Sequence, residues 1–404
     1  MTSDRAEAST LRDRVRTMME QHWTPWGYTV PHAARYPFQW LWDSCFHAII
    51  WAELGDERAV TELASVFRHQ TPSGLVPHVT YDAHPTVHAD FWGRPGTSTI
   101  TQPPMFGHAA AELGRRGFAV PDRTLEQASR GLRFLLDRRP RIDGLVPLCH
   151  PWESGADDSP RWDHWFAPTW DAATRYQRKG KLVASLVLDD EGAAITNPGF
   201  MVASAGFNAL VAFNAAELAS VTADDALAGH ARELAERLDA RWDPTLETWT
   251  DATSTPSTSS TIRTADSLLP LLVIDRPISA ALLDPRAYGT PFGPAGVHTA
   301  EATYDPGAYW RGSTWPQITY LLAVAASRRS NPKTAGELER LLQAGATRSG
   351  LAEHWHAQEG TALGSAPQSW TGLAIVRQRI EQSRSSGSCV LPHVSCTDLA
   401  MPGG

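Results

Sequence analysis

The chain has 404 residues, of which 42% are hydrophobic and 20% charged, and its formal net charge is −8. This acidity argues against nucleic acid or an anionic membrane as a partner and fits a neutral substrate. The N-terminus lacks the apolar core of a signal peptide and no apolar run could span a membrane, so we expect a soluble, cytoplasmic protein. The 16 tryptophans exceed ordinary usage and favour a binding cleft lined by aromatic rings.

Four cysteines are too few for a disulfide scaffold. Cys45 and Cys149 lie in apolar stretches and are expected to be reduced core thiols. Cys389 and Cys396 lie in a Ser/Gly-rich C-terminal stretch, where pairing stays open. We therefore expect a single large domain over residues 1–382, followed by a flexible tail over residues 383–404.

Hydrophobic spacing, capping residues and prolines predict roughly twelve helices and no convincing run of alternating strands. After a first helix at 5–21 and a second capped by Asp43 or Ser44, the predicted helices fall at 58–69, 104–117, 123–138, 197–220, 223–240, 265–273, 278–286, 316–328, around 338–345 and 368–382. Gly345 is expected to shorten or end the helix that carries it. Residues 164–196 have no clear pattern.

A short motif occurs twice, as residues 74–78 (Gly-Leu-Val-Pro-His) and 143–147 (Asp-Gly-Leu-Val-Pro). Each copy follows a helical segment and precedes a loop rich in His, Asp and Trp. Repeated helical hairpins indicate a closed or stacked all-α array. Helices that alternate with long loops predict an (α/α)6 barrel with its functional loops gathered at one rim.

The most informative stretch is residues 150–163, a loop that is dense in carboxylates and indole rings. Indole rings offer flat apolar faces to a sugar, and carboxylates accept hydrogen bonds from its hydroxyls. A carboxyl whose pKa is raised by burial can also act as a general acid. The alternative is a solvated acidic turn. The four acids of this loop are Glu153, Asp157, Asp158 and Asp163.

Four stretches resemble glycoside hydrolase family 63, in particular its short bacterial mannosylglycerate and glucosylglycerate hydrolases, and more distantly the trehalases. They are Gln39-Trp-Leu-Trp-Asp-Ser44, Gln102-Pro-Pro104, residues 153–162 (Glu-Ser-Gly-Ala-Asp-Asp-Ser-Pro-Arg-Trp) and residues 309–316 (Tyr-Trp-Arg-Gly-Ser-Thr-Trp-Pro). A weaker match joins Glu353, Gly364 and residues 369–371. The resemblance implies an (α/α)6 barrel and inverting hydrolysis of an α-glycoside without a metal or organic cofactor.

The resemblance assigns the general acid to Asp157 and the general base to Glu353, with Glu359 and Glu301 as rivals for the second role. Gly155 is expected where the backbone approaches the sugar, Gln102 is either a hydroxyl ligand or a backbone partner, and Arg311 either lines the site or pairs with a loop acid. The full substrate-binding set is Tyr36, Trp40, Trp42, Asp43, Gln102, Trp152, Gly155, Tyr309, Trp310, Arg311 and Trp315.

The chain departs from the glycerate-specific hydrolases after Arg178, where the arginines expected to bind the glycerate carboxylate are missing. The clamp is either absent or rebuilt from Arg175, Arg178, Lys179 or Lys181, and a lysine loses the bidentate geometry of arginine. A neutral aglycone, such as another sugar, is therefore at least as well supported as glycerate. Glucose and mannose are both open as the glycone.

Other functions stay open at this stage. Within the same class the alternative is a trehalase or a disaccharide α-glucosidase. A sugar epimerase or isomerase would use His78, His150 and His354 as proton shuttles, and a non-catalytic sugar-binding barrel would keep the tryptophans alone. No metal is expected, because His354 and His356 lack a third ligand at suitable spacing.

Overall fold

The computed structural model describes residues 2–166, 171–254, 260–277 and 280–377. The predicted tail at 383–404, with Cys389 and Cys396, lies outside these residues. The α-helices are α1 (Thr2–His22), α2 (Leu41–Glu53), α3 (Arg58–Ser65), α4 (Ala89–Trp92), α5 (Phe106–Arg115), α6 (Asp122–Arg133), α7 (Asp163–Phe166), α8 (Ala172–Val183), α9 (Ala205–Thr222), α10 (Asp225–Asp239), α11 (Pro316–Arg328) and α12 (Pro332–Arg348).

Shorter helical segments complete the described chain. They are the π-helix η1 (Phe134–Arg138) and the 3₁₀ helices η2 (Pro151–Ser154), η3 (Pro160–Trp162), η5 (Ala265–Leu272), η6 (Ala280–Leu282) and η7 (Ser369–Ile375). The strands β1 (Gln39–Trp40), β2 (Val79–Thr80), β3 (Val187–Leu188), β4 (Ala194–Thr196), β5 (Val202–Ala203), β6 (Trp242–Asp243), β7 (Thr248–Trp249), β8 (Ala252–Thr253), β9 (His354–Trp355) and β10 (Ala362–Leu363) pair antiparallel as β1–β2, β3–β4, β5–β8, β6–β7 and β9–β10.

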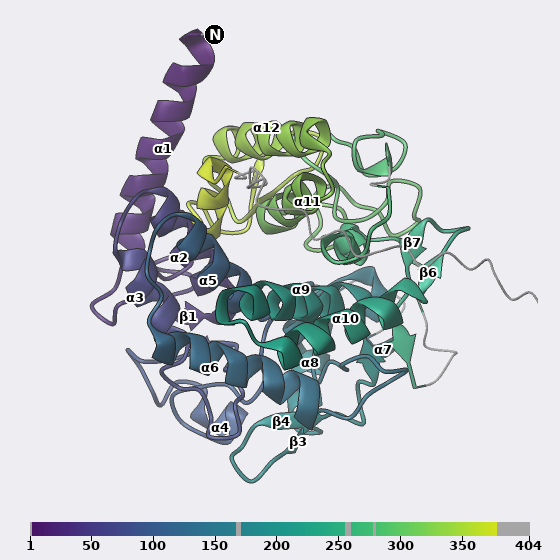
Figure 1. The fold of residues 1–404 in the computed structure, drawn as a ribbon. Helices are drawn as coiled ribbons and strands as arrows, with labels where there is room; N and C mark the ends of the chain where they lie inside the picture. The colour runs from purple at the N-terminus through teal and green to yellow at the C-terminus, as the bar shows by residue number, and fades with distance from the viewer. Residues whose placement is uncertain (1, 167–170, 255–259, 278–279, 378–404) are drawn as a thin grey trace, which may run out of the picture.

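Six inner segments form a closed ring. Helix α2 packs against α5, α5 against α9, α9 against η5, η5 against α11, α11 against η7, and η7 returns to α2. Outer helices cover them: α3 packs on α2, α6 and α10 on α9, α12 on α11, and α1 on η7 (Figure 1). The ring is the (α/α)6 barrel that the sequence predicted.

The inner helices are buried along most of their length, as helices enclosed by others are. In α2 every residue from Leu41 to Ala52 is buried. Small residues let such helices approach closely. A Cβ on Gly107 of α5 would collide with the backbone of Asn214 in α9, so only glycine permits this crossing.

The helix that carries Gly345 does not end there, contrary to the sequence prediction. Helix α12 continues to Arg348, and its predicted apolar positions Leu338, Leu341 and Leu342 are buried. The indole of Trp355 occupies the space that a Cβ on Gly345 would need. The glycine therefore makes room for a ring, and the hydrogen bonds of the helix are kept.

Several predicted boundaries are also wrong. Helix α2 begins at Leu41, so Asp43 and Ser44 lie in its first turn and neither caps it. The helix expected from 197 begins at Ala205, because residues 202–203 pair as a strand with β8 and the Ser204 side chain caps the helix by accepting from the backbone N of Phe207. The segments expected as helices at 278–286 and 368–382 are 3₁₀ turns within the described residues.

The two copies of the repeat occupy corresponding places. One follows α3 and leads to β2, and the other follows η1 and leads to the acidic loop at 150–163. Gly74 and Gly144 both have positive φ, which suits glycine. Cys45 and Cys149 are buried free thiols, as predicted. None of the described helices is long and apolar enough to cross a membrane.

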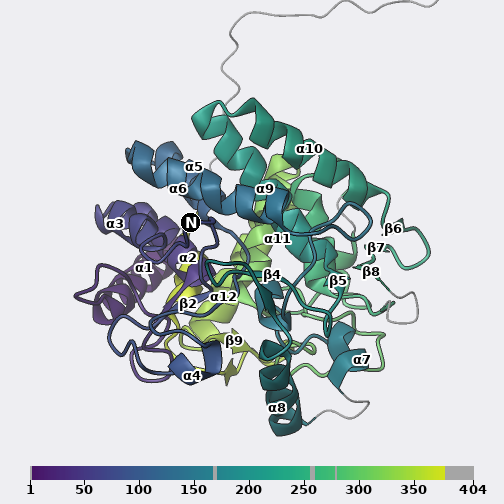
Figure 2. The ribbon, with the colours of Figure 1, turned by 90° about the horizontal axis from the view of Figure 1, so that it is seen from below.

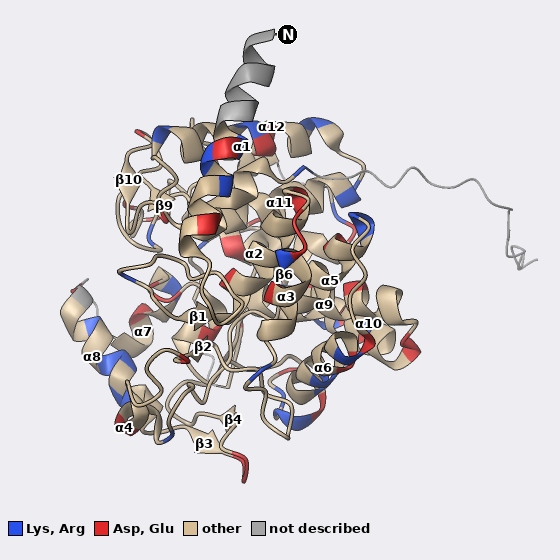
Figure 3. Ribbon diagram, turned by 90° about the vertical axis from the view of Figure 1, so that its left-hand side faces the viewer, with Lys and Arg blue, Asp and Glu red and all other residues tan. Residues whose placement is uncertain are grey.

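Helix α8 differs from the other helices in charge. It lies beside α7 at the edge of the molecule (Figure 2) and carries Arg175, Arg178, Lys179 and Lys181. On the face in Figure 3 acidic and basic residues are mixed elsewhere, whereas the charged residues seen on α8 are basic. Arg175 and Lys179, one turn apart, are buried, while Arg178 and Lys181 are exposed.

Candidate active site

The acidic loop is fixed at its first half by a buried ion pair. Glu153 accepts two hydrogen bonds from the Arg139 guanidinium, at 2.8 and 2.7 Å, and both side chains are fully buried. It also accepts from the backbone amides of Thr101 (3.1 Å) and Cys149 (2.6 Å). Glu153 is therefore a structural anchor, since its oxygens are occupied by the chain itself.

The second half of the loop is fixed in the same way. Arg161 donates to both carboxylate oxygens of Asp251, at 2.8 Å each, and also pairs with Asp266. The indole of Trp162 donates to the carbonyl of Ala156 at 2.8 Å. Asp157 thus lies on a short segment held at both ends.

Gly155 turns the chain just before the acid, with a φ of 74°. A Cβ at this position would lie 2.6 Å from the ring of Trp42, which fills the space beside it. The prediction that Gly155 gives a sugar close access to the backbone is not supported, because Trp42 occupies that space. Gly155 and Trp42 instead form one packed unit beneath the acid.

The surroundings of Asp157 favour its protonated form. The side chain is mostly buried but still reaches solvent, and burial is the main cause that raises its pKa to about 7. The positive charge of Lys179 lowers this pKa, and the negative charges of Asp158 and Glu353 raise it. A carboxyl with a pKa near 7 is protonated in about half of the molecules at pH 7 and can still donate its proton.

Glu353 lies just before β9 and is 3% exposed. Its Oε2 accepts hydrogen bonds from the backbone N (3.0 Å) and the hydroxyl (3.3 Å) of Ser365. Gly364 has a φ of 72°, and a Cβ there would strike the Glu353 carboxylate. Burial raises the pKa of Glu353, whereas Ser365 and Arg35 lower it, so this carboxylate is oriented and partly stabilised in its charged form.

Tyr36, Asp43 and Tyr309 lie around the two carboxylates. The Tyr36 hydroxyl is hydrogen-bonded to Glu353. Asp43 is 3% exposed, and burial together with the charge of Glu353 raises its pKa well above the usual range. Burial and the charges of Asp157 and Glu353 raise the pKa of Tyr309 as well. The structure thus gathers five of the predicted residues.

Trp315 has both ring faces covered, and one face of Trp310 is covered by Trp315. Their rings stack at 3.8 Å with an interplanar angle of 7°. The other face of Trp315 stacks on His354 at 4.4 Å, so both of its faces are covered. The edge-on contacts of Tyr309 with Trp315 (5.1 Å) and His354 (5.4 Å) show that this stack supports Tyr309.

Arg311 takes the structural alternative. It holds Asp163 with two parallel hydrogen bonds of 2.9 and 2.8 Å. Arg175 of α8 donates to the same carboxylate at 2.7 Å. Asp163 therefore ties the loop at 305–316 to α8, and the prediction that Arg311 contacts sugar is not supported.

Three more predicted residues lie at the edge of this group. Gln102 is buried, and its Oε1 accepts from the backbone N of Trp42 at 3.4 Å, which satisfies an N-terminal amide of α2. Trp40 packs edge-on against Tyr36 (6.3 Å) and is partly exposed. Trp152 packs against His150 at 4.3 Å within a second apolar cluster, so its described contacts are structural.

The rival acids and the histidines fit other roles. Glu301 pairs with Arg263 at 2.6 Å, and Glu359 is exposed. Burial lowers the pKa of each of the three candidate shuttle histidines to about 3, so they stay neutral near pH 7 and cannot cycle a proton there. These are His78, His150 and His354.

One group in the described part of the chain has metal-like spacing. Ligand atoms of His108, Glu112 and Glu217 lie within 4.8 Å of one another. Both ring nitrogens of His108 are already engaged, by Glu217 at 3.2 Å and Tyr320 at 3.0 Å. Arg115 contacts both carboxylates, at 2.7 and 2.8 Å. The group is an ion network that joins the inner helices α5, α9 and α11.

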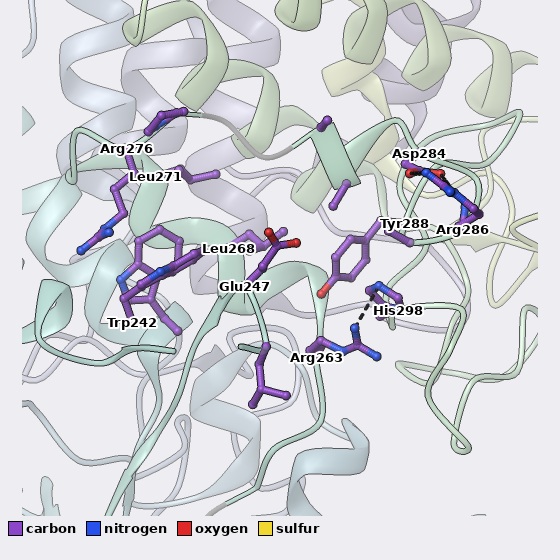
Figure 4. A pocket seen from close by; sticks show the side chains of 16 residues that line it. Trp242, Glu247, Arg263, Leu268, Leu271, Arg276, Asp284, Arg286, Tyr288 and His298 are labelled. Atoms are coloured by element: carbon purple, nitrogen blue, oxygen red, sulfur yellow. Dashed lines mark hydrogen bonds and ion pairs between the residues drawn. The ribbon is translucent and has the colours of Figure 1, made fainter. Parts of the chain in front are cut away.

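A cavity of about 700 Å³ lies elsewhere, between the β6–β7 hairpin, η5 and η6. Its lining includes Trp242, Tyr288 and Arg263, and Arg263 contacts His298 at 3.2 Å (Figure 4). None of the predicted site residues lines it. The cavity is therefore separate from the paired carboxylates.

The barrel and the paired carboxylates define the class of protein: an (α/α)6-barrel glycoside hydrolase. Residues 36–371 match the family described as the mannosylglycerate hydrolase MGH1-like glycoside hydrolase domain. The chain belongs to this family. It is an inverting α-glycosidase of glycoside hydrolase family 63 that acts on small glycosides, as the sequence resemblance predicted.

Individual relatives agree with this placement. The chain is 28% identical to the mannosylglycerate hydrolase of Thermus thermophilus over 404 residues, covering 85% of this chain and 94% of that protein. It is 29% identical to the glucosylglycerate hydrolase of Mycolicibacterium hassiacum over 408 residues, covering 84% and 91%. The structure of a GH63 mannosylglycerate hydrolase from Thermus thermophilus in complex with glucose matches with a TM-score of 0.77 at 26% identity, covering 90% of this chain and 98% of that one.

Sequence reasoning did not find the residues that orient the carboxylates. Ser365, which holds Glu353, and Arg139, which holds Glu153, lie outside every motif, and no local pattern marks them. The nearest signal was a glycine, since Gly364 precedes Ser365 and was part of the weak match.

Proposed function

We propose that Asp157 and Glu353 are the general acid and general base of an inverting hydrolysis of a small α-glucoside or α-mannoside. The observation that carries this proposal is the difference in what surrounds the two carboxyls. Burial raises the pKa of both, to about 7 for Asp157, whereas Ser365 and Arg35 counteract the effect of burial at Glu353. Glu353 accepts two hydrogen bonds from Ser365, which favour its charged form.

In the proposed reaction Asp157 donates its proton to the glycosidic oxygen as the bond to the anomeric carbon breaks. On the opposite face, Glu353 removes a proton from the water that attacks this carbon, so the released sugar has the β configuration. Water must fit between base and sugar, and the two carboxyls of such enzymes stand ~6.5–9.5 Å apart. Tyr36 donates a hydrogen bond to Glu353 and can keep this carboxylate aimed at the water.

Tyr309 and Asp43 are the best-supported sugar ligands in this proposal, because both feel the charge of each carboxylate. Burial and the charge of Glu353 raise the pKa of Asp43, which favours the protonated form that can donate a hydrogen bond. Trp40, which is partly exposed, can present its ring to the sugar. Trp42 supports the acid from beneath through Gly155.

We propose that the leaving group is neutral, which the chain supports at least as well as it supports glycerate. The relatives are mannosylglycerate and glucosylglycerate hydrolases. In this chain, however, the four cations from which a glycerate clamp could be rebuilt are engaged or turned outward. Arg175 and Lys179 pair with Asp158, Arg178 donates to the carbonyl of Phe166, and Lys181 is exposed.

The first test is proton NMR of the enzyme with 2-O-α-mannosylglycerate, 2-O-α-glucosylglycerate, α,α-trehalose and neutral α-glucosides and α-mannosides. We expect the β-anomer to appear first, and the fastest substrate identifies the leaving group. Initial release of the α-anomer would contradict the assigned roles. A marked preference for a glycerate glycoside would show that the proposed aglycone is wrong, and cleavage of trehalose alone would make the protein a trehalase.

General properties of the chain support a proposal for its cellular location, its partners and its cofactors. We propose a cytoplasmic enzyme, because Cys45 and Cys149 are free thiols and no described helix could cross a membrane. The net charge of −8 supports a small carbohydrate as the partner, without nucleic acid. The same mechanism requires neither a metal nor an organic cofactor.

A further inference from the structure

A buried network of charges joins the acidic loop to α8. Lys179 is 4% exposed, and its Nζ donates to Oδ1 of Asp158 at 2.9 Å. Asp158 directly follows Asp157 in the loop. One turn earlier on α8, Arg175 is 1% exposed and donates to Asp158 at 3.3 Å and to Asp163 at 2.7 Å. The buried basic residues of α8 therefore contact the acidic loop directly.

Pairing of Asp158 does not by itself account for Lys179. A buried ammonium loses its hydration, and chains retain one only where the charge is compensated or used. Arg175 already contacts Asp158, and Asp163 is held by both Arg175 and Arg311. Asp157 is the residue directly before Asp158, so the ammonium that holds Asp158 also acts on Asp157.

Helix α8 is held against the loop at the level of Lys179. Burial lowers the pKa of His150 to about 3, so its ring is neutral. Its Nδ1 accepts from the backbone N of Trp152 at 3.2 Å, which leaves Nε2 as the donor to the carbonyl of Lys179 at 2.9 Å. The ammonium itself lies 5.9 Å from the ring of Trp152. Its position is thus fixed at both the backbone and the side chain.

We propose that Lys179 is a positioning residue for the hydrolysis, whose buried ammonium holds Asp158 and sets the strength of the acid Asp157. This inference rests on the proposed role of Asp157 as the proton donor. Lys179 lowers the pKa of Asp157, while burial, Asp158 and Glu353 raise it. Without the lysine, Asp157 would be a weaker acid that keeps its proton to higher pH and transfers it less readily to the leaving oxygen.

The effect of Lys179 on the pKa of Asp157 can be separated from the effects of the other groups that face Asp157. They come from the acidic loop, α8, α2 and the loops before β1, α11 and β9, and they are Asp158, Lys179, Asp43, Tyr36, Tyr309 and Glu353. Both tyrosines have pKa values raised above 10 and stay neutral. The charges that raise the pKa of Asp43 are Glu353, Glu62 and Asp157. A shift caused by changing Lys179 therefore reports on Asp157.

The test is the pH profile of kcat and kcat/KM for Lys179→Met, Lys179→Arg and the matched control Lys181→Met. The control removes the same charge from the exposed face of the same helix. The substrate is whichever of the two glycerate glycosides or trehalose the wild type cleaves fastest. In Lys179→Met we expect the alkaline limb to move up by about one pH unit with a lower plateau in kcat. Lys179→Arg should keep the wild-type limb, as should the control.

An unchanged alkaline limb in folded Lys179→Met would overturn the inference, and so would an equal shift in Lys181→Met. If Lys179→Met does not fold, Asp158→Asn carries the test. It removes a negative charge beside Asp157, so the limb should move to lower pH, and no downward shift would overturn the inference. The proposed function is tested separately by Asp157→Asn. Near-normal turnover in that variant would exclude Asp157 as the general acid, independently of the result for Lys179.

Discussion

Replacing Asp157 with asparagine removes the proposed proton donor and preserves the shape of the side chain. The ordinary pKa of this carboxyl is 3.8, and the structure raises it to about 7. At pH 7 about half of the molecules then carry the proton, against roughly 0.06% at the ordinary value. The surroundings therefore increase the fraction of molecules with a protonated Asp157 at pH 7 by roughly 800-fold.

A general acid contributes about 10²–10⁴ in rate, which corresponds to roughly 3–5 kcal/mol of activation free energy. We expect kcat of Asp157→Asn to fall by that factor with little change in KM, because the amide can still fill the site. Initial rates with a natural α-glycoside should be compared with rates on α-glucosyl fluoride. Fluoride departs without full protonation, so its hydrolysis should lose much less. Glu359→Gln, on the exposed rival acid, serves as the control.

Near-normal turnover of the glycoside by Asp157→Asn would refute this reasoning. An equal loss on both substrates would also contradict it, because a defect in proton donation has to depend on the leaving group. Such a result would point to misfolding or to a nucleophilic role. Circular dichroism of the variant separates these two explanations.

Three further predictions concern the base, the anchor of the loop and pH. Glu353→Gln should reduce kcat by several orders of magnitude because it removes the base. Azide needs no general base, so it should restore turnover and give the β-glycosyl azide as product. Rescue that yields only free sugar would exclude Glu353 as the base. Arg139→Met should lower the free energy of unfolding, measured by urea denaturation, by about 3–5 kcal/mol because it leaves Glu153 charged and buried. In the same assay the control Arg340→Ala, at an exposed ion pair, should lower it by less than about 1 kcal/mol. Because the pKa of Asp157 is raised on folding, the contribution of this carboxyl to stability should be lost as pH rises from about 4 to 7. The Tm of Asp157→Asn relative to the wild type should therefore rise over that range and stay constant below pH 4.

The sequence by itself determined the helical periodicity and the barrel, and it singled out the two carboxylates that we propose as acid and base. Helical spacing is local, so α5, α9, α10 and α11 appeared within a few residues of their observed bounds, apart from the late start of α9. The acidic loop was recognisable because the residues that carry the chemistry are adjacent in the chain. The resemblance could therefore assign roles to Asp157 and Glu353 before any contact between them was known.

Only the tertiary structure decided which neighbours each residue meets. Asp163 and Glu153 sit in the same loop as Asp157 and look alike in sequence, yet arginines from distant segments hold both of them. The faces of Trp315 are covered by Trp310 and His354, which the sequence could not show for a ring in an aromatic loop. Such differences arise from long-range packing, which sets burial and charge, and these in turn separate a proton donor from a structural acid.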